Sequence, residues 1–401
     1  MARQIAAAQR SRKSMAAAAL LLAVAMTVAA GAARAQLSEP CRFNDVGEVW
    51  MPGTIGLPGN VAQDVLSLNT ASPFAVPADE LARYTNLRLL VLDQLAHLRV
   101  VPQLPRLRTV ALWLGAFPST FLSYLGGVSV EQIAFSGLIN DAPATVAVVP
   151  PLVATHVSWL QINHSGRGVT WNLAELDRLP FLETLQLKSA TLASLAPLAG
   201  ATRLRHLVLD DIEVAAGERL LDLSALAALD CFSAKNSGKP KAWILRLPAS
   251  GSLRLLSLQQ AAPVSIDGLD RQADLVSLDL AYSRIDDFSF LPRLTRLERL
   301  WLQGTALPDL ELVPGEALQR LGIDARLLRS ADALDRFPHL RQLYLRGPID
   351  VDLVLALTEK ESLQRIGGRL GDPEDLDALR GLADFRLTWF TRSGDFQLFR
   401  F

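Results

Sequence analysis

The stretch that decides the fold is residues 275–302, which read LVSLDLAYSRIDDFSFLPRLTRLERLWL. It carries the spacing L-x-x-L-x-L twice, first at Leu275, Leu278 and Leu280 and again 22 residues later at Leu297, Leu300 and Leu302. Alternating apolar residues predict a short strand with one buried face. The residues that follow recur at three-residue intervals and predict a short 3₁₀ or α-helical return segment: Ile285, Phe288, Leu291 and Leu294.

The same register continues along most of the chain. One such unit cannot cover its own leucines, so each coil has to stack on its neighbours. The first position of the pattern recurs about every 23 residues, which falls inside the range for such repeats. It is found at Leu87, Leu107, Val130, Val157, Leu182, Leu204, Leu229, Leu253, Leu275, Leu297, Leu318, Leu340, Leu363 and Leu382.

This pattern resembles the leucine-rich repeat superfamily, and most closely the short-coil bacterial internalin-like class. The resemblance implies an α/β fold, a solenoid with a curved parallel β-sheet and short helical or 3₁₀ return segments. Members of the family often carry Asn at the ninth repeat position, and this chain departs from that pattern. Hydroxyl groups can partly replace the amide and alanine cannot, so a less regular turn is expected. The positions concerned are Ser165, Ala190, Ser237, Ala261, Ser283 and Thr305.

The N-terminus has the features of a secretory signal peptide. A basic region precedes an uncharged apolar run over residues 15–33, and Ala33-Arg34-Ala35 supplies an A-x-A cleavage site. An uncleaved membrane anchor is the alternative, since the run could nearly span a bilayer. Cleavage after Ala35 predicts an exported protein, periplasmic or extracellular, without a stable membrane span. Its net charge would be −6, because residues 1–35 hold five basic and no acidic residues and the whole chain carries −1. Such a chain is a poor candidate for nucleic acid.

The expected organisation has four parts. Residues 1–35 form the signal peptide and residues 36–62 an N-terminal cap, in which Gly and Pro are frequent. Residues 63–390 form the solenoid, and residues 391–401 form a C-terminal cap. End coils need such caps because their leucines would otherwise face water.

The two cysteines are expected to stay unpaired. Cys41 precedes the first coil and Cys231 lies about seven coils further on, a separation of roughly 30 Å at the usual strand spacing. A disulfide requires Cα atoms within about 7 Å. Cys231 is therefore predicted to be a free, outward-facing thiol with no assignable base beside it.

The ligand-binding surface is predicted on the concave face of the sheet. The third, fifth and seventh positions of each strand point out there, because side chains alternate along a strand. Trp, Tyr and Arg are enriched at binding hot spots. The first predicted cluster is Trp301, Tyr344, Arg299, Arg320, Arg346 and Arg365, and the second is Trp159, Gln161, Asn163, Gln186 and His206. In the alternative interpretation, the aromatic rings only cover neighbouring aliphatic side chains.

No catalytic, metal-binding or cofactor motif stands out. The favoured hypothesis is a non-enzymatic binding scaffold that recognises a protein or glycan partner on its concave face. A structural protein of the cell envelope is the second hypothesis. A hydrolase-type enzyme is the least favoured, because the repeats leave almost no residues for a catalytic domain.

Overall fold

The structure is a computed structural model that describes part of the chain. The described residues are 65–69, 85, 89–93, 104–113, 131–137, 145–147, 156–164, 170–174, 176, 179–214, 220–235, 243–261, 263–391 and 393–400. The predicted signal peptide and N-terminal cap lie outside them, as do Cys41, Ser165 and Ser237. Within the described residues, no helix is long and apolar enough to cross a membrane.

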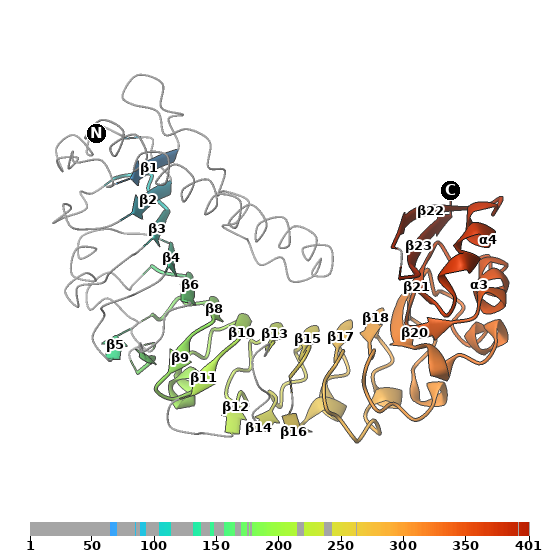
Figure 1. Ribbon diagram of the computed structural model, residues 1–401. Coiled ribbons are helices and arrows are strands. Elements are labelled where there is room, and N and C mark those ends of the chain that lie inside the picture. Colours follow the sequence, from blue (N-terminus) through green and yellow to red (C-terminus); the bar gives the residue numbers. More distant parts are fainter. Residues whose placement is uncertain are drawn as a thin grey trace, which may run out of the picture. The chain divides into compact units, whose positions relative to one another are not determined.

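The main element is a 16-stranded sheet that is parallel from β1 to β21 (Figure 1). Its parallel strands are β1 (Val65–Asn69), β2 (Leu89–Asp93), β3 (Thr109–Trp113), β4 (Gln132–Gly137), β6 (Trp159–His164), β8 (Thr184–Lys188), β10 (His206–Asp210), β13 (Cys231–Ser233), β15 (Leu255–Ser257), β17 (Ser277–Asp279), β18 (Arg299–Trp301), β19 (Arg320–Asp324), β20 (Gln342–Ile349) and β21 (Arg365–Leu370). From β2 to β21, each of them begins two residues after a predicted first position. The predicted register is confirmed over these coils.

The core is one continuous stack of apolar side chains between the main sheet and the return segments. Leu278, Leu280 and Leu300 are 0% exposed, and Leu302 is 1% exposed. The same core cluster includes the return-segment residues Ile285, Phe288, Leu291 and Leu294. The leucines of neighbouring coils therefore cover one another, as the repeat requires.

The return segments take two forms along the chain. The later coils use short helices, as predicted: η6 (Leu269–Arg271), η7 (Leu291–Arg293), η8 (Leu310–Leu312), η9 (Ala325–Leu327), η10 (Ala331–Leu334), α3 (Val351–Thr358), η11 (Pro373–Asp375) and α4 (Leu376–Arg380), with η5 (Ala196–Gly200) earlier. Several earlier coils instead use extended segments in two further parallel sheets: β5 (Thr145–Ala147), β7 (Thr170–Asn172), β9 (Thr191–Leu192) and β11 (Glu213–Val214), then β12 (Leu220–Asp222), β14 (Trp243–Arg246) and β16 (Pro263–Asp267). The prediction of helical returns was wrong there, because β-rich sequences such as Trp243-Ile244-Leu245 favour extended backbone.

The turn after six of the described strands places a left-handed residue at the eighth position. Positive φ occurs there at Ser189, Asp211, Gln260, Tyr282, Gly304 and Gly347. In three of these turns the ninth residue donates its N–H to the carbonyl of the sixth residue: Ala261 to Leu258 (2.9 Å), Ser283 to Leu280 (3.0 Å) and Thr305 to Leu302 (3.2 Å). The backbone thus makes this turn with Ala or Thr alike, and the expected loss of regularity at Ala261 does not occur. The hydroxyl of Ser283 also donates to the Leu258 carbonyl of the preceding coil.

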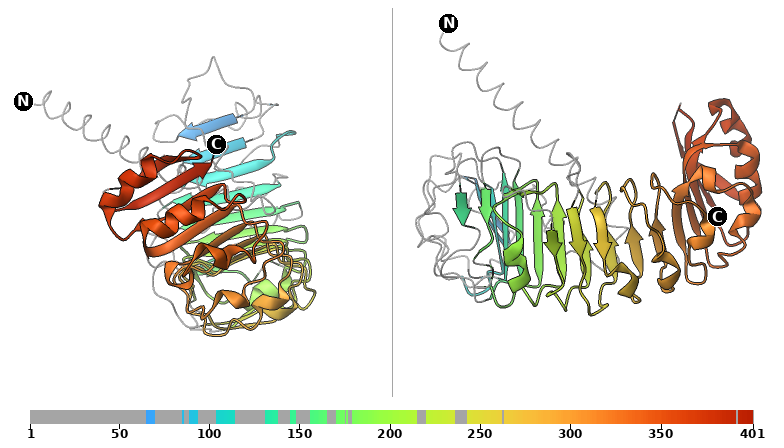
Figure 2. Two further views of the ribbon diagram at one scale, coloured as in Figure 1. Left: turned by 90° about the vertical axis from the view of Figure 1, so that its right-hand side faces the viewer. Right: turned by 90° about the horizontal axis from the view of Figure 1, so that it is seen from below.

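The C-terminal end of the sheet reverses direction. Strand β23 (Asp395–Arg400) pairs antiparallel with β21, and β22 (Phe385–Phe390) pairs antiparallel with β23 at the edge (Figures 1 and 2). The predicted last repeat position, Leu382, therefore does not begin another parallel coil. Phe385, Phe396 and Leu398 are buried in the core, because the hairpin covers the last parallel coil.

Candidate binding surface and cysteine group

The C-terminal part of the outer sheet face, opposite the core, alternates aromatic residues with glycines. At the fifth position, Trp301, Gly322, Tyr344 and Gly367 lie on four neighbouring strands, β18 to β21. A Cβ on Gly322 would come within 2.4 Å of Trp301 Cε3, and one on Gly367 within 3.0 Å of Tyr344 Cδ1. The rings occupy space that only glycine leaves open.

The two rings contact each other across Gly322. The centroids of Trp301 and Tyr344 are 5.0 Å apart with an interplanar angle of 47°. Guanidinium groups border the rings: Arg365 Cζ lies 5.2 Å from the centroid of Tyr344 and 4.5 Å from that of Phe399. The charge of Arg320 also acts on the Tyr344 hydroxyl, and Arg346 lies two residues after Tyr344 in β20. We call Trp301, Tyr344, Arg320, Arg346 and Arg365 the aromatic–arginine surface.

The arginines of this surface differ in their exposure. Arg320 and Arg365 are half-buried and Arg346 is exposed. Arg346 also bonds the Asp324 carboxylate (3.3 Å) and lies 5.4 Å over the ring of Tyr282. Arg299 is only 6% exposed, so its prediction as an exposed contact residue was wrong. Its side chain, at the third position, is flanked by Ser277 and Arg320 on the adjacent strands. A side chain that points away from the core can therefore still be buried by its neighbours on the sheet.

Two ionisable groups near these rings have shifted pKa values. Burial raises the pKa of the Tyr344 hydroxyl, while the charges of Arg365 and Arg320 oppose the shift. Burial also raises the pKa of Asp279 to about 6, against the hydrogen bond from the Ala281 N–H and the charge of Lys235. Asp279 pairs with Trp301 on the neighbouring strand. The Asp279 carboxyl, on the strand next to Trp301, therefore keeps its proton to a higher pH than an exposed aspartate does.

The second predicted cluster is less open than expected. Trp159 is 4% exposed and Gln186 is 1% exposed, so the prediction of an exposed Trp159 was wrong. The side chains of Gln132 and Thr184 flank Trp159 on adjacent strands. Gln161 and His206 are half-buried. Asn163 lies in β6, and its side chain is outside the described part.

Cys231 corrects another prediction, because it is disulfide-bonded and 0% exposed rather than a free thiol. The only other cysteine of the sequence is Cys41, which lies outside the described residues. The distance argument treated Cys41 as fixed ahead of the first coil. The 23 residues between Cys41 and Val65 lie outside the repeat register, and a chain of that length can span up to roughly 80 Å. Sequence distance in coils therefore does not limit where this cysteine reaches.

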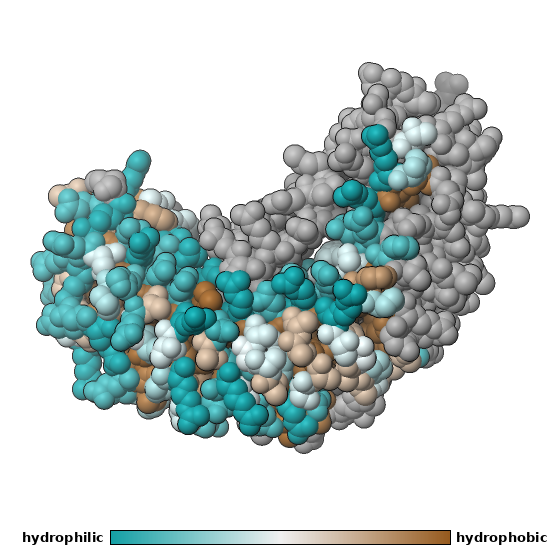
Figure 3. Space-filling model, turned by 180° about the vertical axis from the view of Figure 1, so that it is seen from behind, coloured by the Kyte–Doolittle hydropathy of each residue, from teal (hydrophilic) through white to brown (hydrophobic). Residues whose placement is uncertain are grey.

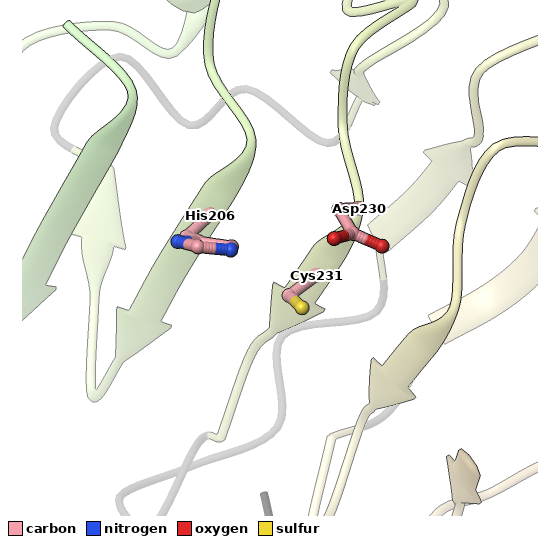
Figure 4. A group of neighbouring side chains, drawn as sticks. All are labelled: His206, Asp230 and Cys231. Atoms are coloured by element: carbon pink, nitrogen blue, oxygen red, sulfur yellow. The ribbon is translucent and has the colours of Figure 1, made fainter. Parts of the chain in front are cut away.

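A base does lie beside Cys231, contrary to prediction. His206 and Cys231 pair directly on β10 and β13, and Asp230 immediately precedes β13 (Figure 4). One ligand atom from each of these three residues lies within 4.8 Å of the others. Nδ1 of His206 also contacts Thr184 Oγ1 at 3.2 Å. Burial lowers the pKa of His206, while the Asp230 charge opposes this shift.

The sequence contained signals for the residues that were missed. Aligning the coils places Gly322 between Trp301 and Tyr344, and it also places His206 beside Cys231. Asp230 was harder to find, because strict alternation assigns it to the face opposite Cys231. It lies just outside the strand, where alternation does not apply.

The rest of the described surface gives weaker indications of a binding site than the aromatic–arginine surface. The face seen from behind mixes hydrophilic and hydrophobic side chains (Figure 3). A cavity of about 810 Å³ lies beside the ends of β19 and β20, where Asp324, Arg326, Arg346 and Asp350 line it. It shares Asp324 and Arg346 with the border of the aromatic–arginine surface.

Comparisons with known proteins find similarity in structure. A leucine-rich repeat protein of Leptospira interrogans is 15% identical, with a TM-score of 0.48 over 77% of this chain and 85% of that chain. An internalin of Listeria monocytogenes is 16% identical, with a TM-score of 0.45 over 76% and 87%. A plant peptide hormone receptor in complex with RGF2 is 14% identical, with a TM-score of 0.30 over 71% and 63%. No protein-family model and no curated protein matches the sequence. The parallel sheet, the buried leucines and the confirmed register give this chain the fold of a leucine-rich repeat solenoid.

Proposed function

We propose that this protein is an exported, non-catalytic scaffold that binds a protein partner through the aromatic–arginine surface. The observation that carries the proposal is the alternation of Trp301, Gly322, Tyr344 and Gly367 across four strands. It fixes two large rings on a rigid sheet without burying them fully. Rigid aromatic side chains lose little conformational entropy on binding, and for that reason they serve as anchors.

The arginines favour a partner with carboxylate groups. Arg365 donates to the amide oxygen of Gln397 (2.7 Å) and contacts two rings. Within the described part of the chain it makes no ion pair with a carboxylate. Arginine can hold a carboxylate through two parallel hydrogen bonds, which adds both energy and orientation. An acidic segment that also presents an apolar side chain to the rings would match this surface.

Export and the absence of catalysis belong to the same proposal. The apolar run and the A-x-A site support secretion to the periplasm or the outside of the cell. Two alternatives remain distinct. A glycan partner would stack on the ring faces and need few carboxylates, and a structural envelope protein would show no saturable ligand.

Cross-linking capture from the native envelope and culture fluid tests the proposal. We expect the wild-type protein to capture a partner saturably, and Trp301→Ala with Arg320→Ala to reduce its affinity at least tenfold. The matched control is Arg293→Ala with Arg296→Ala. Both of these arginines are exposed, and their surface ion pairs with Asp270 and Asp274 contribute little to stability. Far-ultraviolet circular dichroism confirms that each variant is folded.

Three outcomes would contradict parts of the proposal. Equal capture by the surface variant and the control would exclude the aromatic–arginine surface. Capture that survives protease treatment of the sample but not glycosidase treatment would assign a glycan ligand instead. Capture that never saturates would favour the structural envelope protein.

A further inference from the structure

The group formed by His206, Asp230 and Cys231 combines three kinds of metal ligand in one place. Direct pairing of β10 with β13 puts the imidazole beside the sulfur, and the carboxylate comes from the residue that leads into β13 (Figure 4). One ligand atom from each lies within 4.8 Å of the others. Ligand atoms around a tetrahedral ion are separated by about 3 to 4 Å, so small side-chain movements would complete the geometry.

The chemistry of the donors selects a class of metal ion. Thiolate sulfur, imidazole nitrogen and carboxylate oxygen together suit Zn²⁺ and similar late first-row divalent ions, whereas Mg²⁺ and Ca²⁺ require oxygen ligands. Three protein ligands would leave a fourth position for water. The contact between Thr184 Oγ1 and His206 Nδ1 (3.2 Å) orients the imidazole in the manner of outer hydrogen bonds around metal ligands.

Two features currently oppose occupancy of this group by a metal ion. The sulfur of Cys231 is bound in a disulfide, and a disulfide sulfur is a far weaker ligand than a thiolate. The Asp230 carboxylate is 3.8 Å from the guanidinium of Arg205, whose side chain is 55% exposed. Such a partly exposed pair is weak, so a divalent ion would displace Arg205 readily.

We propose that Cys231 in its thiol form, together with His206 and Asp230, binds one zinc-class divalent ion, and that the disulfide excludes this ion. The thiol form exists before the disulfide forms, or after a dithiol reductant supplies two electrons and two protons. That reaction converts the disulfide into two thiols while the dithiol becomes a disulfide. The Cys231 thiol then releases its proton as the sulfur binds the ion. This site is separate from the aromatic–arginine surface and does not depend on the proposed function.

The variant Cys41→Ser tests the proposal, because it leaves Cys231 without an intramolecular cysteine partner and needs no reductant. Co²⁺ is the probe, since a thiolate-bound Co²⁺ gives a charge-transfer absorption band in the near ultraviolet. We expect this band in Cys41→Ser at one Co²⁺ per chain, and no band in the oxidised wild-type protein. Zn²⁺ should abolish the band by competition.

Further variants separate this group from accidental binding by a thiol. Adding His206→Ala or Asp230→Asn to Cys41→Ser should weaken Co²⁺ binding about 10- to 100-fold, whereas the exposed control His339→Ala should leave it unchanged. Wild-type protein reduced by a phosphine is the second preparation, and far-ultraviolet circular dichroism shows whether each sample is folded. The proposal is overturned if neither preparation gives the band or if His206→Ala binds equally well. It is also overturned if both preparations unfold, because the disulfide would then be a structural requirement.

Discussion

Gly322 is the residue on which the contact between Trp301 and Tyr344 depends. A Cβ there would lie 2.4 Å from Trp301 Cε3 and 2.2 Å from Gln303 Nε2, so both side chains would have to move. We expect Gly322→Val to destabilise the protein by about 1–3 kcal/mol and to change the near-ultraviolet circular dichroism of the rings. Gly200→Ala is the control, because its Cβ would meet nothing within 4 Å. An unchanged ring spectrum in Gly322→Val would show that the rings do not need this glycine.

Asp279 makes stability depend on pH. Its folded-state pKa of about 6 lies above the ordinary value of 3.8, so the folded protein retains a proton that the unfolded chain releases. This contribution is complete below pH 3.8 and is lost as the pH rises through about 6. Asp279→Asn should remove this slope and be more stable than wild type above pH 7, by up to about 3 kcal/mol and less where solvent screens the carboxylate. Urea unfolding between pH 4 and pH 8 checks this, with the exposed Asp286→Asn as control.

At the scale of the element, substitutions at the eighth position of the turn are expected to have opposite effects in two coils. Gly304 has φ of 71°, and a Cβ would lie 2.8 Å from Tyr282 Cδ1. Gly304→Ala should therefore lower the free energy of unfolding by about 1–2 kcal/mol. Gln260 holds the same turn at φ of 59° with an exposed side chain, so Gln260→Gly should cost nothing or stabilise slightly. Equal effects of the two substitutions in chemical denaturation would contradict this account.

The strands could be predicted from the sequence because each depends on a local pattern and on an identical neighbour. Leu275, Leu278 and Leu280 determine one register, and stacking repeats it. The extended returns at β12, β14 and β16 depend instead on pairing with one another, which no single coil specifies. The exposure of third-position residues such as Trp159 and Arg299 depends on how neighbouring side chains fill space, and alternation alone does not give it.

At the scale of the whole molecule, the C-terminal hairpin of β22 and β23 closes the repeat. It buries Phe385, Phe396 and Leu398, each of which contributes about 1.5–3 kcal/mol by burial. Deleting residues 385–401 should lower the melting temperature and cause self-association through the uncovered edge of β21, as measured by size-exclusion chromatography. The control, Trp389→Ala with Phe390→Ala, changes residues that are 49% and 48% exposed and should keep stability within about 1 kcal/mol. A monomeric, equally stable truncation would show that the hairpin is not a cap.

The long-range contacts were the least predictable from the sequence. The reversal after Leu382 follows a segment that still fits the repeat spacing, so the local pattern could not reveal it. The disulfide of Cys231 was equally unpredictable, since the repeat pattern says nothing about which thiols are oxidised. The rings of Trp301 and Tyr344 were found because their columns belong to the repeat, where position along the chain determines position in space.

β17 begins 22 residues before β18, and this repeat length has a consequence for how the gene can change. Since both strands begin two residues after their pattern leucine, removing or duplicating one 22-residue unit leaves the flanking coils in phase. Unequal recombination can therefore lengthen or shorten the protein without a new folding problem. Each such event would move Trp301 relative to His206 by about 4.8 Å, one strand spacing. Gain or loss of whole repeats would thus change the distance between Trp301 and His206 in steps of one strand spacing.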